Sequence, residues 1–114
     1  MSILVSELQR VKAQEVGITD DTLSIDLDDG RTISVPIAWY PRLWHGQPEE
    51  RQNWRLIGDG TGIHWPDLDE DISIEGLLLG KRSGESQRSL NRWLEKRRKQ
   101  NKGNGTGSLI EGEA

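Results

Sequence analysis

The feature that most constrains the fold of this chain is a strict alternation of apolar and polar residues over 22–37, interrupted by the pair Asp29-Gly30. The apolar positions are Leu23, Ile25, Leu27, Ile33, Val35 and Ile37. A period of two is typical of β-strands with one buried face. Aspartate and glycine tolerate the positive φ angles of a tight two-residue turn. The pattern therefore predicts a β-hairpin, with Pro36 near the end of the second strand.

Shorter strand patterns lie on both sides of this hairpin. Residues 11–18 indicate a strand whose two halves are out of phase, which a β-bulge near residues 15–17 would reconcile. Residues 55–57 and 63–65 indicate two short strands around a glycine-rich loop, Gly58-Asp59-Gly60-Thr61-Gly62. We therefore expect an α+β fold in which one or two short helices pack on a small antiparallel sheet.

The first two helices are expected directly after the hairpin. Residues 38–45 predict one short helix, with Pro41 in its first turn and Gly46 at its end. Pro48 and the acidic residues after it predict the start of a second helix that runs to about residue 54.

Two more helices are expected in the second half of the chain. Asp71 is a candidate N-cap for a short helix that ends at Gly80, and a strand at 72–74 is the competing interpretation. Residues 83–99 have the best helical pattern of the chain, with an apolar stripe formed by Leu90, Trp93 and Leu94.

Charge is distributed unevenly along the chain. Residues 1–80 carry six Lys or Arg and fifteen Asp or Glu, a net charge of −9, whereas residues 81–114 carry nine and four, a net charge of +5. We therefore expect an acidic α+β domain over 1–80, a basic amphipathic helix over 81–100 and a disordered tail over 101–114. Such a division often marks an interaction tail.

The overall composition bounds the class of protein. Only 32% of the 114 residues are hydrophobic, so the core is small and a protein partner or a homo-oligomer is favoured. The chain has no cysteine, which excludes disulfides and thiolate chemistry. Residues 1–10 do not resemble a signal peptide, and no apolar run is long enough to cross a membrane. We expect a cytoplasmic protein.

Two motifs resemble ligand loops without matching them. Gly58-x-Gly60-x-Gly62 lacks the spacing of the dinucleotide fingerprint and precedes a strand, which favours a structural hairpin. Asp67-x-Asp69-x-Asp71 would begin an EF-hand loop, but Ile72 and Leu78 stand where such a loop needs glycine and glutamate. We therefore expect no metal site and no cofactor.

The two histidines are candidates for acid–base chemistry. His45 and His64 lie nineteen residues apart, and neither comes with a nucleophile motif or a third zinc ligand of the usual kind. An enzyme that uses His64 with Asp67 or Asp69 is one hypothesis. Packing of each histidine with a satisfied ring nitrogen is the simpler interpretation, and we expect no enzymatic activity and no catalytic residue.

Residues 39–65 hold four of the five tryptophans, interleaved with arginines. Because the chain has no phenylalanine, Trp39, Trp54 and Trp65 are candidates for its core. Tryptophan and arginine are also the residues that most often anchor protein interfaces. Trp44 is predicted to be partly exposed. The candidate partner-binding set is Trp39, Tyr40, Arg42, Trp44, Arg51, Trp54, His64 and Trp65.

The basic helix offers a second candidate surface. Clustered basic side chains bind phosphates with release of counterions, so nucleic acid is an alternative partner. The candidate residues are Arg88, Arg92, Lys96, Arg97, Arg98 and Lys99. A solvated helix, or one that binds an acidic protein, explains the same pattern, and a single helix does not make a helix-turn-helix.

Residues 25–80 resemble the bacterial domain-of-unknown-function family numbered 2442. The motifs that carry the resemblance are Asp29-Gly30-Arg31, Val35-Pro36, Trp39-Tyr40-Pro41-Arg42-Leu43, Pro48-Glu49-Glu50-Arg51, Asn53-Trp54, Gly58, Gly62-Ile63-His64-Trp65-Pro66, Leu68-Asp69-Glu70-Asp71-Ile72-Ser73 and Leu77-Leu78-x-Gly80. The resemblance implies a small α+β domain, no established enzymatic activity and no catalytic residues.

Members of that family are often encoded beside a second small protein, as in toxin–antitoxin pairs, and some are fused to a helix-turn-helix domain. The leading hypothesis is therefore a non-enzymatic protein-binding module that acts as the antitoxin-like or regulatory partner of another small bacterial protein. Nucleic-acid binding through residues 83–99 is the alternative.

Overall fold

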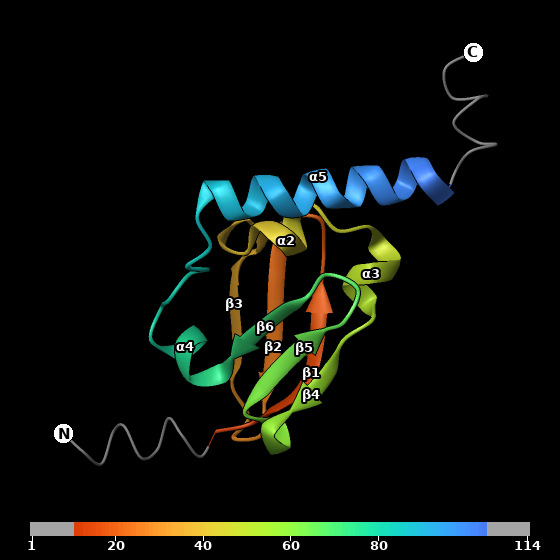
Figure 1. Ribbon diagram of the computed structural model, residues 1–114. Coiled ribbons are helices and arrows are strands. Elements are labelled where there is room, and N and C mark those ends of the chain that lie inside the picture. The colour runs from red at the N-terminus through yellow and green to blue at the C-terminus, as the bar shows by residue number, and fades with distance from the viewer. Residues whose placement is uncertain (1–10, 105–114) are drawn as a thin grey trace. The chain divides into compact units, whose positions relative to one another are not determined.

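The computed structural model describes the backbone of residues 11–104 and the side chains of residues 11–100 (Figure 1). The chain divides into two compact units, residues 1–83 and residues 84–114. Within the described residues, the first unit contains two three-stranded antiparallel sheets joined by short helices, and the second contains one helix. The predicted α+β fold class is therefore confirmed, with a second small sheet in addition to the first.

The first sheet contains three strands in sequence order: β1 (Ala13–Ile18), β2 (Thr22–Leu27) and β3 (Thr32–Pro36). The apolar residues of β2 are all buried, as the alternation predicts. Ile25 pairs with Val16 on one side and with Ile33 on the other. The register of β1 shifts between Ala13 and Glu15. The predicted bulge is therefore present, slightly earlier than expected.

The turn between β2 and β3 differs from the predicted two-residue turn. The backbone N–H of Leu27 donates to the carbonyl of Arg31 at 2.8 Å, which leaves three residues in the loop. Gly30 has a φ of +94°, and Asp29 has no positive φ. A two-residue type I′ turn needs positive φ at both central positions, so that prediction is wrong. The geometry is that of a three-residue hairpin loop with glycine at its left-handed position.

Three short helical segments follow the hairpin: η1 (Ile37–Trp39), α2 (Pro41–Trp44) and α3 (Pro48–Gln52). The predicted single helix over 38–45 is thus two separate turns. The break lies at Tyr40, whose φ of −126° and ψ of 88° are not helical. A residue that precedes proline is pushed out of the helical region by the proline ring. The predicted start of α3 at Pro48 is confirmed, and a capping box between Gln47 and Glu50 fixes it.

The second sheet contains β4 (Arg55–Ile57), β5 (Gly62–Trp65) and β6 (Glu70–Ser73) in that order. The turn η2 (Gly58–Gly60) joins β4 to β5. Gly58, Asp59 and Gly60 all have positive φ, between +58° and +93°. Three successive left-handed residues explain why this loop is rich in glycine. The interpretation of the motif as a structural hairpin is confirmed.

The helix α4 (Ile74–Leu78) follows β6 directly. Its N-cap is Ser73, whose hydroxyl accepts a hydrogen bond from the N–H of Gly76 at 2.8 Å. The prediction of Asp71 as the N-cap is wrong, because β6 continues past it and pairs Asp71 with His64. The competing prediction of a strand was the better one here. Gly80 follows the end of α4 with a φ of +78°, as expected for a residue that stops a helix.

The helix of the second unit is α5 (Gln87–Asn104). It starts four residues later than predicted, because Ser86 caps it by accepting a hydrogen bond from the N–H of Ser89 at 3.1 Å. It also continues through the first four positions of the predicted disordered tail, 101–114, whose remainder lies outside the described residues. Among the described helices, α5 included, we find none with the length and apolar character that crossing a bilayer requires.

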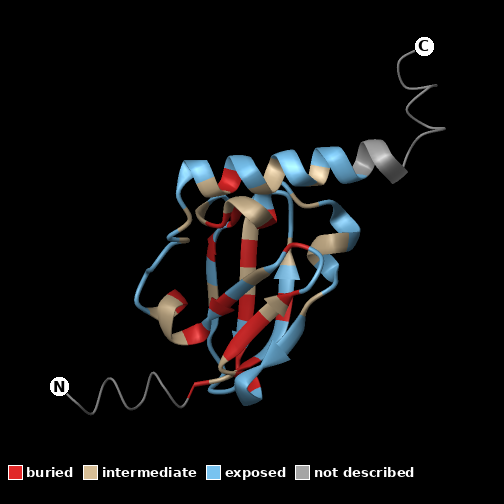
Figure 2. Cartoon of the chain, in the orientation of Figure 1, coloured by how far each residue is buried: buried red, intermediate tan, exposed pale blue. Residues whose placement is uncertain are grey.

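The core of the first unit contains buried residues of both sheets, of the short helices and of the turn between β5 and β6 (Figure 2). Leu43 comes from α2 and Leu68 from that turn, and both are fully buried. A Cβ at Gly46 would lie 2.9 Å from Cδ1 of Leu68, so glycine allows the end of α2 to approach the turn between β5 and β6. This close approach brings α2 beside the second sheet.

Candidate partner-binding surface

Trp44 lies at the end of α2 and is 49% exposed, which confirms its predicted partial exposure. Its backbone is fixed from both ends of the short helix. Pro41 occupies the first helical position, where its locked φ suits the helix. The guanidinium of Arg51 donates to the carbonyls of Leu43 at 2.9 Å and Trp44 at 2.7 Å. A rigid turn therefore presents a large aromatic side chain to solvent.

Arg42, on the same helix, binds within the protein. Its guanidinium donates to the carbonyl of Asp69 at 3.1 Å and to the Asp69 carboxylate at 3.4 Å. Asp69 has a φ of +52°, a conformation that aspartate tolerates better than most residues. Arg42 thus holds the tight turn between β5 and β6 against α2. Like Arg51, it holds α2 through hydrogen bonds to backbone carbonyls.

Trp39 and Tyr40 attach the segment after α4 to the start of α2. The guanidinium of Arg82 lies 4.6 Å from the centre of the Trp39 ring. The hydroxyl of Tyr40 donates to the carbonyl of Lys81 at 2.9 Å, and the Tyr40 side chain is buried. Burial raises the pKa of Tyr40, and the nearby carboxylate of Glu70 raises it further. Trp39 is half-buried.

The two remaining tryptophans of this region differ in burial. Trp65 is fully buried, and its indole N–H donates to the carbonyl of Arg51 at 3.0 Å. Trp54 is half-buried. The prediction of Trp65 as a core residue is therefore confirmed, while Trp39 and Trp54 lie at the edge of the core. Of the eight candidate residues, Trp44 is the one with a largely exposed side chain.

The acidic side chains of the second sheet have separate partners. The Nδ1 atom of His64 pairs with Asp71, whereas Asp67 accepts a hydrogen bond from the side-chain amide of Asn53 at 2.9 Å. The hypothesis that joined His64 to Asp67 or Asp69 is therefore wrong about the partner. Across residues 11–100, no three or more His, Cys, Asp or Glu side chains gather as a metal site would require.

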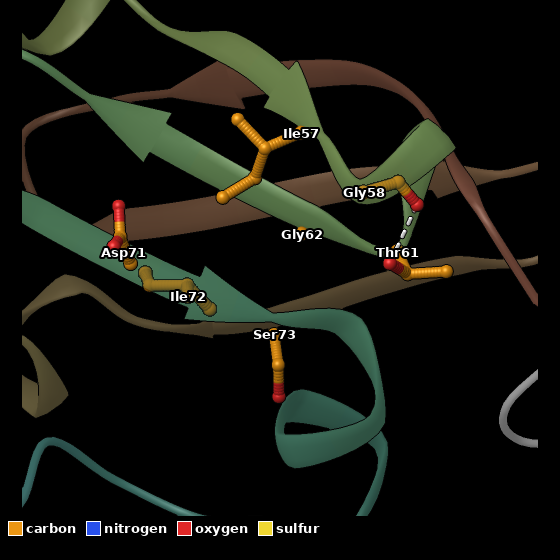
Figure 3. Close-up of a pocket in the computed structure, with 7 residues that line it drawn as sticks. All are labelled: Ile57, Gly58, Thr61, Gly62, Asp71, Ile72 and Ser73. Atoms are coloured by element: carbon orange, nitrogen blue, oxygen red, sulfur yellow. Dashed lines mark hydrogen bonds between the residues drawn. The ribbon is translucent and has the colours of Figure 1, made fainter.

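The outer face of the second sheet follows from its register. Gly62 pairs with Ile57 of β4 and with Ser73 of β6. Directly opposed residues of antiparallel strands share a face, and Gly62 has no side chain to fill that face. A hollow of about 430 Å³ results, lined by Ile57, Gly58, Thr61, Gly62, Asp71, Ile72 and Ser73 (Figure 3).

The sequence did not predict this hollow as a candidate site. The alternation in β5 places Gly62 and His64 on the face opposite the buried Ile63 and Trp65. The sequence could therefore have predicted that Gly62 leaves this face of β5 without a side chain. The sequence could not predict that Ile57 and Asp71 lie on the same face, because this depends on how β4 and β6 pair with β5.

The basic residues of α5 do not all share one face. Helical spacing places Arg88, Arg92, Lys96 and Lys99 together. The guanidinium of Arg97 lies 4.7 Å from the centre of the Trp93 ring, and Arg98 pairs with Glu95. Of the six candidate nucleic-acid-binding residues, four therefore lie on one face of α5, and the other two interact with side chains of the same helix.

Comparison with known proteins supports the fold and identifies the family. A crystal structure of a protein of unknown function from Rhodospirillum rubrum shares 24% identity with the chain, with a TM-score of 0.59 over 68% of this chain and 96% of that one. A solution structure of an uncharacterised protein from Chromobacterium violaceum shares 20% identity, with a TM-score of 0.59 over 80% of this chain and 82% of that one.

No curated protein matches the chain. The model of one protein family, described as a protein of unknown function (DUF2442), matches residues 13–83, which is more than half of the sequence. This match spans both sheets, the helices between them and α4. The chain therefore belongs to the DUF2442 family.

Proposed function

We propose that this protein is a non-enzymatic protein-binding module, which acts in the cytoplasm as the antitoxin-like or regulatory partner of another small bacterial protein. The observation that carries the proposal is the exposure of Trp44 on a turn with a fixed backbone. Because the backbone is already held, binding has to order only the side chain of Trp44, which reduces the entropy lost. Tryptophan is also among the residues most enriched where interfaces gain most of their affinity.

The charge of the first unit favours a basic partner. Residues 11–83 contain seven Lys or Arg and fourteen Asp or Glu, a net charge of −7. The electric field of this negative charge accelerates association with a positively charged surface and disfavours acidic partners. The resemblance to a family whose members are often encoded beside a second small protein supports a protein partner, and the charge adds that this partner is basic.

The test is affinity purification of the protein from its native host in the presence of nuclease, followed by binding measurements with the protein that co-purifies. We expect Trp44→Ala to weaken that binding by about 2 kcal/mol, or about thirtyfold, because the indole is the anchor. Leu79→Ala is the matched control, since Leu79 is another exposed apolar residue, at 53%, and lies after α4.

Unfolding in denaturant, measured on both variants, separates loss of the anchor from loss of the fold. An unchanged affinity of Trp44→Ala, or an equal loss in Leu79→Ala, would contradict the proposal. So would unfolding of Trp44→Ala at denaturant concentrations that leave Leu79→Ala folded.

Nucleic-acid binding through α5 is the second candidate. Between residues 87 and 100 the helix carries six Lys or Arg and one Glu, and four of these cations lie on one face. Each phosphate that such a face neutralises releases counterions, so affinity would fall steeply with salt concentration. An anchor-based protein complex depends less on salt, which distinguishes the two candidates.

A further inference from the structure

The hollow on the outer face of the second sheet is a cavity that the Trp44 surface does not use. Its volume of about 430 Å³ falls within the range of about 300–1,000 Å³ that is usual for ligand pockets. Gly62 forms part of its floor, and the side chain of Ile57 reaches toward that position from β4 (Figure 3).

The wall and floor of the hollow offer mainly apolar contact. A Cβ at position 62 would lie 3.2 Å from Cγ1 and 3.5 Å from Cδ1 of Ile57, and the polar atom near it would be the carbonyl oxygen of Ile72 at 3.5 Å. The hydroxyl of Thr61 already donates to the carbonyl of Gly58 at 2.7 Å. The hydroxyl of Ser73 already accepts from Gly76. An aliphatic chain laid over Gly62 would therefore contact Ile57 without displacing a polar partner.

The rim of the hollow carries one negative charge. Asp71 is the charged residue among the seven that line it, and its side chain is 67% exposed. His64 pairs with one oxygen of this carboxylate and so orients it. A carboxylate has about four acceptor sites, so Asp71 can accept further hydrogen bonds from a ligand.

We propose that this hollow binds the cationic side chain, arginine or lysine, of a basic protein partner. These side chains combine an aliphatic stem with a charged head, and they commonly lay the stem on apolar surface. Here the stem lies over Gly62 against Ile57, and the head reaches the carboxylate of Asp71. The net charge of −7 over residues 11–83 favours such a partner. This inference rests on the proposed protein-binding function and names a contact for it.

The experiment uses the full chain and does not require the natural partner. Amide resonances are followed by NMR while three short peptides are added, whose residues are all uncharged except for a central position that is arginine, lysine or uncharged citrulline. We expect the arginine and lysine peptides to shift the amides of Gly62, Asp71 and Ser73, with a Kd on the order of 1 mM. Citrulline has nearly the shape of arginine but no charge, so we expect its peptide to leave them unshifted.

Two substitutions test the two halves of the site. Asp71→Asn should weaken binding of the arginine peptide about fivefold, the upper end for an exposed ion pair. Gly62→Ala should weaken it about fourfold by occupying the hollow, with Ile57 moving by only a few tenths of an ångström. Gly17→Ala in β1 is the matched control, because a Cβ there meets nothing within 4 Å, and it should bind as the unaltered protein does.

The outcomes separate this inference from the proposed function. Equal shifts with the citrulline peptide, no shifts with any peptide, or full binding by Gly62→Ala would overturn the cationic side-chain site. Shifts at Gly62 that depend on protein concentration alone would mean that a second copy fills the hollow, which would also overturn it. The effect of Trp44→Ala on the co-purified partner does not depend on any of these results.

Discussion

Two ion pairs of the first unit shift the pKa values of charged side chains. Lys12 pairs with Asp59 at 2.9 Å, which raises the pKa of the lysine and lowers that of the aspartate. In the hairpin, Nε of Arg31 donates to the carboxylate of Asp29 at 2.8 Å, and its backbone N–H donates to the same carboxylate at 3.1 Å. These bonds hold the pKa of Asp29 below its ordinary value.

The pairing of Asp29 with Arg31 predicts a dependence of stability on pH. Because the folded state lowers the pKa of Asp29, its contribution is present above the unfolded pKa of about 3.9 and is lost as the pH falls through the folded pKa. Arg31→Gln should raise the pKa of Asp29 in the folded protein, as followed by NMR titration of its carboxyl carbon. Arg55→Gln, on the other sheet, should not. Equal pKa values in the three proteins would show that Arg31 does not cause the shift.

At the scale of the element, α2 shows how a single turn of helix is maintained. Four residues are too few for a stable helix in water. Two features besides the backbone hydrogen bonds within α2 compensate for its short length. Pro41 fixes the first φ angle, and Arg51 satisfies the carbonyls of Leu43 and Trp44 at the last turn. The position of the Trp44 indole therefore depends on an arginine from the next helix.

This dependence predicts a stability cost at Arg51. Arg51→Ala should lower the free energy of unfolding by about 2 kcal/mol, because two carbonyls lose a charged donor. Arg51→Lys should recover only part of that, since an ammonium does not reproduce the two-pronged guanidinium. Denaturant unfolding measures both changes. Arg55→Ala, an exposed arginine on β4, is expected to stay within about 0.5 kcal/mol of the unaltered protein. A loss in Arg51→Ala no larger than that of the control would mean that the clamp is not needed for stability.

At the scale of the whole molecule, the chain combines an acidic unit with a basic helix. The acidic unit favours a basic protein partner and the basic helix favours nucleic acid. Binding of each kind of partner can be tested separately. Replacing Arg88, Arg92, Lys96 and Lys99 by glutamine should abolish binding of duplex DNA or RNA if α5 is a nucleic-acid surface. For the unaltered protein, four phosphate contacts on DNA would give a slope of about −4 in a plot of log affinity against log salt.

The matched control for this prediction is the double change Arg97→Gln and Arg98→Gln. These two cations are engaged with Trp93 and Glu95, so we expect their loss to affect the salt slope little. Absence of nucleic-acid binding by the unaltered protein, or binding that salt does not weaken, would remove the second candidate function.

Most of the local elements can be predicted from short stretches of sequence. Alternation predicts β2 and β3, Pro48 predicts the start of α3, and glycine predicts the left-handed positions of the loop between β4 and β5, because these preferences arise from sterics between near neighbours. Where two local signals competed, as at residues 71–74, pairing with β5 decided in favour of a strand.

The role of each candidate side chain follows from packing between segments. This packing left Trp39 and Trp54 half-buried, assigned Arg51 to the carbonyls of α2, and placed the lining residues of the hollow beside one another on β4, β5 and β6. The sequence contains the residue types for all of these features. Their roles depend on distances between segments that are far apart in the chain, and those distances are set by how the two sheets and the turns pack.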